Sequence, residues 1–348
     1  MLQEVFSKRQ HHGRVGIYVA EIGLNHNGDI AIAKSMVEAA AVAGADAVKF
    51  QTLIPELLNS VYTTSLLENG KDDKVDVSQI DFFSRFTLTA EDYFQLKELA
   101  ESLGMVFFSA PFDKKSLALL EDIGVSLYKI ASSEVSNIQL IRSIAATGKP
   151  AIMSTGISLK DSIKNAVETY KTSGGGEMVL LHCVSNYPVA AENINARRVA
   201  SLRREFGLHT GFSDHSNGTK AMILAAAFGA RIFEKHFTID SNYDCPDKAV
   251  SASPKEFSAM INEVEESIMM LGDGDIDFGA SEEPVAKAAC RSLFAGRNIS
   301  VGSLITEDDI MALRPGVGIS AVSIDSLIGR KVKVAIEKDK LLRLEFFE

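Results

Sequence analysis

Apolar segments of strand length recur along the chain and alternate with segments whose apolar residues follow a helical period. Eight of them are rich in β-branched and aromatic residues, namely residues 15–23, 46–52, 106–112, 126–132, 150–156, 178–184, 209–215 and 231–237. The segments between them place apolar residues three or four positions apart, and most of them close at a glycine. This alternation predicts parallel strands that are connected by helices.

Helix-start signals divide the chain at the same places. Asp29 precedes the first helical segment and is a predicted N-cap. Thr89 and Asp92 have the spacing of a capping box, in which two side chains satisfy each other's backbone N–H groups. Ser253 and Glu256 repeat that spacing before the last long helical segment. We therefore expect helices to begin directly after residues 29, 89 and 253.

Eight strands that alternate with helices over roughly 270 residues match the (β/α)8, or TIM, barrel, so the predicted fold class is α/β. The alternative is a doubly wound open sheet, which usually has fewer strands and a glycine-rich phosphate loop after the first one. Neither GxGxxG nor GxxxxGK(S/T) occurs in the chain, which favours the barrel. We expect an N-terminal arm at residues 1–14 and the barrel at residues 15–282.

The pattern changes in the last part of the chain, residues 283–348. Apolar runs become short there, and turn residues recur every few positions. Short apolar runs separated by turns are typical of small β structures. This part is therefore predicted to form a small separate domain.

Composition narrows the function classes. The formal net charge is −10, from 36 Lys and Arg against 46 Asp and Glu, so nucleic acid is not an expected partner. The three cysteines are odd in number and widely spaced, which is typical of a reduced, cytoplasmic compartment. The polar first 14 residues do not resemble a signal peptide, and no apolar run approaches the ~18 residues of a membrane span. No membrane association is expected.

Polar side chains occur at or just after all eight predicted strand ends, where barrels of this type carry their active sites. They include Glu21, Lys49, Gln51, Ser109, Lys129, Ser132, Ser154, His182, Ser185, Tyr187, Ser213, His215 and His236. A charged group buried inside a strand costs several kcal/mol unless it is paired or used. So many polar strand ends together predict a site.

Each of these residues also has an ordinary structural interpretation. Lys49 or Lys129 could form an ion pair inside the barrel with Glu21 or Glu234. A single serine is more often a turn or capping residue than a ligand. His182 alone suits a hydrogen-bonded position in the core. These alternatives remain open from the sequence.

The residue types favour an anionic substrate beside a metal ion. Lysine ammonium groups and serine hydroxyls supply the charge and donors that a phosphate monoester needs, and the chain offers Lys49, Lys129, Ser132, Ser154, Ser185 and Ser213. His215 and His236 end adjacent strands and suit Mn²⁺, Co²⁺ or Zn²⁺ rather than Ca²⁺. Such an ion could polarise a substrate carbonyl. Glu21 is the natural candidate for a general base.

Nine motifs occur in one order along the chain: AEIGLNHNGD, ADAVKFQT, SAPFD, YKIASSE, STG, HCVSNYP, GFSDHSNG, GARIFEKHFTID and CPDKAVSASP. Together they resemble the sialic acid synthase family over nearly the whole chain. The tail from about Arg291, with RPGVGIS, resembles the antifreeze-like (SAF) domain of those enzymes. The resemblance implies a TIM barrel followed by a SAF domain.

The resemblance also implies a reaction. C3 of phosphoenolpyruvate attacks the open-chain aldehyde of an N-acetylated amino sugar, water attacks C2, and C–O bond cleavage releases phosphate. The product is a nine-carbon 2-keto sugar acid. N-acetylmannosamine, which gives N-acetylneuraminate, is the favoured sugar. Legionaminate or pseudaminate synthesis from a 2,4-diacetamido-trideoxyhexose is the alternative.

Residue roles follow from the same resemblance. A divalent metal, Mn²⁺ with Mg²⁺ or Co²⁺ as alternatives, is expected at His215 and His236, and proton transfer at Glu21. Phosphoenolpyruvate is expected at Lys49, Lys129, Ser132, Ser154, Ser185 and Ser213. The sugar is expected at Gln51, Tyr187, Asp247 and Arg314. Since Arg314 lies in the tail, the resemblance implies a domain-swapped homodimer in which residues 283–348 cap the barrel of the other subunit.

The chain departs from the family pattern at several positions. Ala110 stands where threonine is common, and Ser109 or water is expected to cover the lost hydroxyl. Val184 and Ser185 also differ from the usual residues, and Cys245 replaces a frequent glycine. These changes concern the sugar more than the reaction. Two other classes remain as alternatives: a related aldose-phosphate synthase, and a barrel that only binds carbohydrate.

Overall fold

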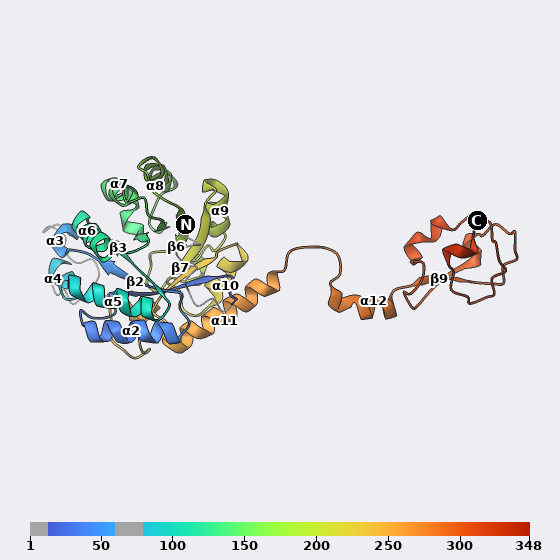
Figure 1. Ribbon diagram of the computed structural model, residues 1–348, viewed down its shortest axis with the longest axis horizontal. Coiled ribbons are helices and arrows are strands. Elements are labelled where there is room, and N and C mark those ends of the chain that lie inside the picture. Colours follow the sequence, from blue (N-terminus) through green and yellow to red (C-terminus); the bar gives the residue numbers. More distant parts are fainter. Residues whose placement is uncertain (1–12, 60–78) are drawn as a thin grey trace. The chain divides into compact units, whose positions relative to one another are not determined.

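The computed structural model describes residues 13–59 and 79–348 (Figure 1). The chain divides into two compact units, Met1–Gly272 and Asp273–Glu348. This division falls at Gly272, before the predicted domain boundary at residue 282. The predicted arm, residues 1–14, lies almost wholly outside the described residues.

The first unit is a closed barrel of eight strands, each parallel to its neighbours (Figure 1). The strands are β1 (Ile17–Gly23), β2 (Ala47–Thr52), β3 (Val106–Pro111), β4 (Tyr128–Ile130), β5 (Ala151–Ser154), β6 (Met178–Cys183), β7 (His209–Asp214) and β8 (Ile232–His236). β1 closes the barrel by pairing with both β2 and β8. Glu21 is the register partner of Lys49 on one side and of His236 on the other. The predicted TIM barrel is confirmed.

Helices surround this barrel (Figure 1). They are α2 (Ile30–Val42), α3 (Pro55–Leu58), α4 (Gln79–Ser84), α5 (Ala90–Ser102), α6 (Lys114–Ile123), α7 (Ile138–Ala145), α8 (Lys160–Thr172), α9 (Arg198–Phe206), α10 (Lys220–Ala227) and α11 (Pro254–Leu271). The predicted helix starts are confirmed. The Asp29 carboxylate accepts from two backbone N–H groups of α2. Capping boxes begin α5 at Thr89 and α11 at Ser253.

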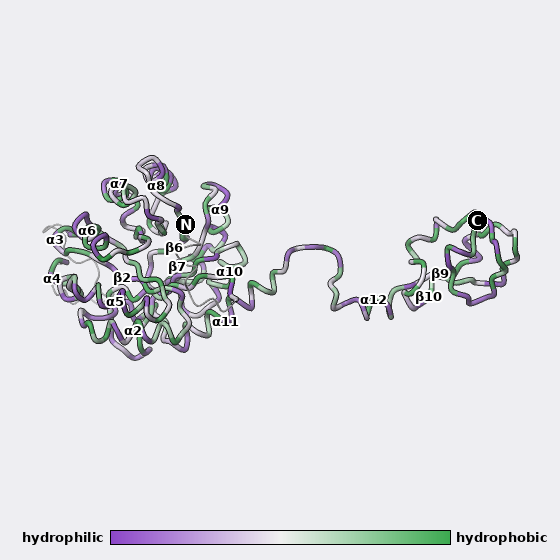
Figure 2. The backbone as a smooth tube through the Cα atoms, in the orientation of Figure 1, coloured by the Kyte–Doolittle hydropathy of each residue, from purple (hydrophilic) through white to green (hydrophobic). Residues whose placement is uncertain are grey.

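The apolar residues form an outer and an inner layer. The outer layer lies between strands and helices, and Figure 2 shows hydrophilic and hydrophobic stretches alternating along the surrounding helices, as expected when each helix buries one face. The inner layer fills the barrel and consists of Val19, Ala47, Phe108, Leu127, Ile152, Val179, Leu181 and Ile232. Because side chains alternate along a strand, Glu234 and His236 share the inward face with Ile232. The barrel is thus plugged by apolar residues below a polar mouth.

The second unit contains the short helix α12 (Glu283–Ala289) and an antiparallel pair, β9 (Ser292–Ala295) and β10 (Ile310–Leu313). Its own apolar core is formed by Leu293, Ala295, Ile299, Ile305, Ile310, Leu327, Val332, Ile336, Leu342 and Phe347. A separate core under short strands and turns confirms the small C-terminal domain.

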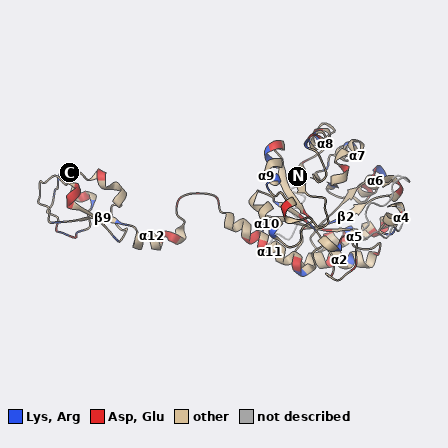
Figure 3. Cartoon of the chain, turned by 180° about the vertical axis from the view of Figure 1, so that it is seen from behind, with Lys and Arg blue, Asp and Glu red and all other residues tan. Residues whose placement is uncertain are grey.

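Charged residues are spread over the helices of the barrel unit (Figure 3). In the described parts of the chain, none of the helices combines the length and the apolar character needed to cross a bilayer. The apolar residues of the barrel unit instead gather in its two internal layers.

Candidate active site at the barrel mouth

Four buried charges form a network at the carboxyl ends of β1, β2, β4 and β8. Lys49 Nζ lies 2.6 Å from Glu21 Oε2 and 3.9 Å from Glu234 Oε1. Lys129 Nζ lies 3.0 Å from the same Glu234 oxygen. The side chains are 5% exposed or less. Ion pairs inside the barrel, an alternative that the sequence left open, are therefore present, while the predicted contact of both lysines with phosphoenolpyruvate stays a prediction.

The pKa values show how these charges depend on one another. Burial alone raises the pKa of Glu234, but Lys129 and Lys49 outweigh it and lower that pKa to about 2. Burial lowers the pKa of Lys49, yet the carboxylates of Glu21 and Glu234 raise it above the usual value. For Lys129, burial lowers the pKa by more than Glu234 raises it. The pKa of Lys129 therefore lies below its usual value, and an arriving anion would stabilise its ammonium form.

Ser154 and Ser213 lie on the inward faces of β5 and β7. Ser213 Oγ donates to Glu234 Oε1 over 2.9 Å. Ser154 Oγ is buried and has no hydrogen-bond partner among the described residues. An unpaired buried hydroxyl costs free energy that a bound ligand can recover. Ser154 is therefore available to an anion without first breaking a bond.

Ser132 and Ser185 converge on Gly156, which follows β5. The Gly156 N–H donates to Ser132 Oγ over 3.0 Å. A Cβ atom at this position would collide with the hydroxyls of both serines. Only glycine lets the two hydroxyls approach this backbone so closely. This glycine was not among the predicted site residues, although it closes the STG motif.

The two predicted metal ligands lie side by side. The ring centroids of His215 and His236 are 5.2 Å apart, and the ring of Tyr187 stacks on His215 at 4.1 Å. His215 Nδ1 lies 2.8 Å from the Val184 carbonyl oxygen. Burial, together with the nearby His236, lowers the pKa of His215 to about 3. His215 is therefore a neutral imidazole at physiological pH.

Asp247 lies beside the second histidine. Its Oδ2 lies 3.2 Å from His236 Nδ1. Burial lowers the pKa of His236, but Asp247 outweighs this and raises it above the usual value. The pKa of Asp247 is lowered, because His236 outweighs the opposing effect of burial. Asp247 was predicted to contact the sugar, and in the structure it contacts His236.

The histidine pair fits a divalent cation. Because the Val184 carbonyl can only accept, Nδ1 of His215 carries the hydrogen and Nε2 keeps the lone pair that a metal needs. Within residues 13–59 and 79–348, no three His, Cys, Asp or Glu side chains converge as a complete ligand cluster. Catalytic sites commonly leave coordination positions to water and substrate. The pair therefore suits an open site rather than a closed structural one.

Two of the predicted sugar contacts, Gln51 and Arg314, belong to different units of the chain. Gln51 reaches the mouth, where its Nε2 donates to Glu21 Oε1 over 3.1 Å. Arg314 lies in the second unit, Asp273–Glu348. Its predicted role across a subunit boundary stays a prediction.

The expectation that Ser109 replaces the hydroxyl lost at Ala110 is wrong. Ser109 Oγ lies 2.7 Å from Thr52 Oγ1, and both residues are buried. Ala110 is the register partner of Gln51 and shares its inward face. Ser109, one residue earlier, points to the opposite face of the sheet, because successive side chains alternate.

Glu234 was expected only as an ion-pair partner, yet it is central to the site. One of its carboxylate oxygens contacts Lys49, Lys129 and Ser213. The sequence signal for this role was the position of Glu234 two residues before His236, which places both side chains on the same face of β8. Pairing with residues from β2, β4 and β7 could not be read from that position alone.

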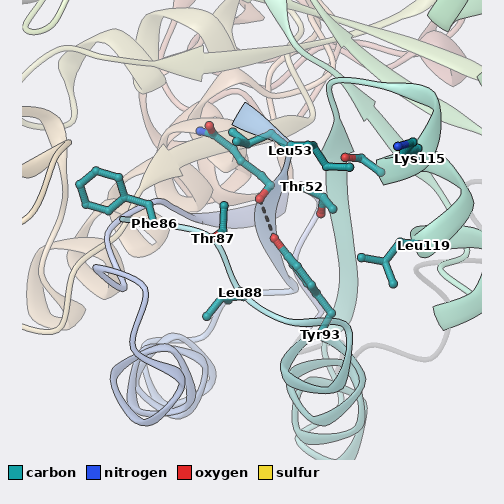
Figure 4. A pocket seen from close by; sticks show the side chains of 11 residues that line it. Thr52, Leu53, Phe86, Thr87, Leu88, Tyr93, Lys115 and Leu119 are labelled. Carbon is teal, nitrogen blue, oxygen red and sulfur yellow. Dashed lines mark hydrogen bonds between the residues drawn. The ribbon is translucent and has the colours of Figure 1, made fainter. Parts of the chain in front are cut away.

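A pocket of about 230 Å³ lies beside the end of β2. Its walls include Leu53, Phe86, Leu88 and Tyr93 (Figure 4). The Tyr93 hydroxyl donates to the backbone carbonyl of Gln51 over 2.7 Å, the dashed line in Figure 4. Of the predicted site residues, only Gln51 is among those that line this pocket.

Comparison with known proteins gives concordant matches. The model of the NeuB family matches residues 36–276, and that of the SAF domain matches residues 291–348. N,N'-diacetyllegionaminic acid synthase of Legionella pneumophila is 35% identical over 335 residues, 95% of this chain and 94% of that protein. Pseudaminic acid synthase of Campylobacter jejuni is 34% identical over 334 residues, 95% of this chain and 96% of that protein. A crystal structure of N-acetylneuraminic acid synthetase from Leptospira borgpetersenii, in complex with citrate, superposes with a TM-score of 0.69 at 33% identity, covering 78% of this chain and 90% of that one.

His182 makes the barrel sensitive to acid. Its Nε2–H donates to the Ile194 carbonyl over 2.7 Å, and burial lowers its pKa from 6.5 to about 4. The unfolded chain therefore takes up a proton at a higher pH than the folded one. Neutral His182 makes its full contribution to the free energy of unfolding above pH 6.5. That free energy falls by about 3 kcal/mol as the pH drops to 4.

His182→Gln keeps a donor near the Nε2 position but cannot titrate. We expect its free energy of unfolding to fall less steeply than that of the wild type between pH 6.5 and 4, by up to about 3 kcal/mol. Denaturant unfolding at pH 7, 5 and 4 measures the difference. Identical slopes in the two proteins would contradict a neutral buried His182.

Proposed function

The chain belongs to the NeuB family, and from this premise we propose that it condenses phosphoenolpyruvate with an open-chain N-acetylated amino sugar and water. The products are phosphate and a nine-carbon 2-keto sugar acid, a nonulosonate. The observation that carries this proposal is the convergence of Lys49, Lys129 and Ser213 on Glu21 and Glu234, where Glu21 is the register partner of His236 in the histidine pair. An anion site next to carbonyl-activating groups is what this reaction requires.

The reaction forms one carbon–carbon bond and one carbon–oxygen bond, and it breaks the carbon–oxygen bond to the phosphate group. C3 of phosphoenolpyruvate attacks the aldehyde carbon, and a water oxygen attacks C2. The C2–O bond to the phosphate group then breaks, and phosphate leaves with the bonding electrons. The proton of the attacking water must be accepted, the alkoxide formed from the aldehyde oxygen must take up a proton, and negative charge on the departing phosphate must be stabilised.

The lysine and carboxylate network suits the anionic substrate. In the free protein Lys49 and Lys129 are neutralised by Glu21 and Glu234. The phosphate and carboxylate of phosphoenolpyruvate would take over part of this neutralisation, together with Ser132, Ser154, Ser185 and Ser213. Glu21 would then be freed from Lys49 to accept the proton of the attacking water. Its remaining hydrogen bond from Gln51 keeps it oriented.

His215 and His236 would hold a divalent metal, which we propose to be Mn²⁺. A metal in this position supplies Lewis-acid polarisation of the aldehyde oxygen. The chain itself prepares the ligands, since the Val184 carbonyl orients His215 and Asp247 contacts His236. Such outer contacts orient metal-binding imidazoles and raise their basicity.

The sugar would lie above this centre, near Gln51, Tyr187 and Asp247. We further propose that Arg314 reaches the N-acetyl group of sugar bound in a second subunit, in a domain-swapped homodimer. N-acetylmannosamine is the proposed acceptor. A 2,4-diacetamido-trideoxyhexose is the second candidate, because relatives named as legionaminic and pseudaminic acid synthases are 34–35% identical to this chain.

A substrate panel tests the proposed reaction. We expect phosphate release from phosphoenolpyruvate, with Mn²⁺ present, for an unphosphorylated N-acetylated amino sugar. The panel contains N-acetylmannosamine, N-acetylglucosamine, 2,4-diacetamido-trideoxyhexoses and an aldose phosphate. His236→Ala should reduce the rate by more than about 100-fold. His209→Ala is the matched control, because His209 is exposed at the opposite end of β7.

Each outcome of the panel separates the alternatives. Turnover of the aldose phosphate alone would assign the chain to the aldose-phosphate synthases. No turnover of any sugar would favour a barrel that only binds carbohydrate. Full activity in the presence of EDTA would refute the metal.

Arg314 provides a test of the swapped dimer. Arg314→Ala should raise the KM for the sugar by about 10- to 100-fold, since a hydrogen bond to a charged group contributes about 1.5–3 kcal/mol. The KM for phosphoenolpyruvate should stay within about 2-fold. Arg330→Ala, in the same unit, should change neither KM. Equal effects of Arg314→Ala on both substrates would contradict a contact confined to the sugar.

A further inference from the structure

A second buried ion pair lies directly behind the histidine pair. Asp214 on β7 is the register partner of Lys235 on β8, and each residue immediately precedes one of the two histidines. Lys235 Nζ lies 2.8 Å from Asp214 Oδ2. Asp214 is 0% exposed and Lys235 is 4% exposed. The pair is therefore as deeply buried as the charges inside the barrel.

The pair faces away from the substrate. Glu234 and His236 point into the mouth, where Glu234 contacts Lys129. Since side chains alternate along a strand, Lys235 between them points outward, toward the layer of helices. None of the proposed reaction steps uses this face. Asp214 and Lys235 thus have no direct access to the reacting atoms.

The two side chains also hold the backbone beyond His215. The Ser216 N–H donates to Asp214 Oδ1 over 2.8 Å. Lys235 Nζ donates to the Ser216 carbonyl. Both polar backbone groups of Ser216 are therefore fixed by the pair. His215 lies between Asp214 and Ser216, so its main chain is constrained on either side, and its own carbonyl accepts from Val189 N–H over 3.0 Å.

Stability alone does not account for this arrangement. Removing two charges from water costs several kcal/mol per ion, and apolar residues of similar size are often equally or more stabilising. A buried pair can instead specify geometry, because its hydrogen bonds have defined directions. Here those bonds run from β8 to β7 and to the loop that follows His215.

We propose that Asp214 and Lys235 are positioning residues that set the distance and orientation of His215 relative to His236, and thereby the affinity of the site for a divalent metal. This inference rests on the proposed metal role of the two histidines. Two imidazoles from different strands bind one ion only if their lone pairs converge. The Lys235–Asp214 ion pair joins β8 to β7 at the residues that directly precede the two histidines.

The test compares metal affinity with stability in full-length variants. Lys235→Met removes the ion pair but leaves the Asp214 carboxylate buried without a cation, which is strongly destabilising. The double variant with Asp214→Asn and Lys235→Met removes both charges and avoids that penalty. Arg14→Met, combined with Asp46→Asn, is the matched control, because it removes both charges of the Arg14–Asp46 ion pair at the other end of the barrel.

Binding of Mn²⁺ alone is measured from the electron paramagnetic resonance signal of the free ion, and stability from the melting temperature. We expect the double variant to melt close to the matched control yet to bind Mn²⁺ about 10- to 100-fold more weakly than the wild type. The matched control should bind Mn²⁺ as the wild type does.

The outcomes separate this inference from the proposed function. Mn²⁺ affinity in the double variant within about 2-fold of a wild type that binds the ion would overturn the positioning role and leave the metal site intact. A double variant that does not fold would make the pair a requirement of folding, which also overturns the positioning role. A wild type that binds no Mn²⁺ would refute the metal site itself, and the inference with it.

Discussion

Four charges buried inside a β-barrel must neutralise one another before any substrate arrives, and this constraint shapes the site. Glu21 pairs with Lys49, and Glu234 pairs with Lys129 and approaches Lys49. Breaking such a pair without replacement costs about 3–5 kcal/mol. An anion that enters between the pairs replaces one carboxylate by another negative group. The network therefore favours an anionic ligand while keeping the free barrel stable.

The alternation of side chains along the strands determines which residues face the inside of the barrel and which face the helices. On the inward face, apolar residues such as Ile232 fill the barrel below, and Glu234 and His236 follow above. On the outward face of the same strand, Lys235 joins Asp214. A single strand thus contributes to the core, to the proposed anion site, to the histidine pair and to the ion pair behind those histidines. A shift of register by one residue would reverse all of these roles.

Local features of the fold could be predicted from the sequence, because they depend on neighbouring residues. Strand alternation, the Asp29 cap and the capping box at Ser253 need only a few adjacent positions. Ion-pair partners could not be assigned, because Lys129 and Glu234 meet only when the barrel closes. The expectation that Ser109 supplies the hydroxyl missing at Ala110 was wrong, because adjacent residues of a strand point to opposite faces.

The bond that breaks in phosphoenolpyruvate is the most direct measure of the proposed chemistry. Phosphoenolpyruvate labelled with ¹⁸O at the bridging oxygen can be incubated with Mn²⁺ and the sugar that the protein accepts, and the products followed by ³¹P NMR and mass spectrometry. Attack of water at C2 with C–O cleavage predicts that the label appears in the released phosphate and is absent from the keto acid. Label retained in the keto acid, with unlabelled phosphate, would mean cleavage of the P–O bond and would contradict the proposed reaction.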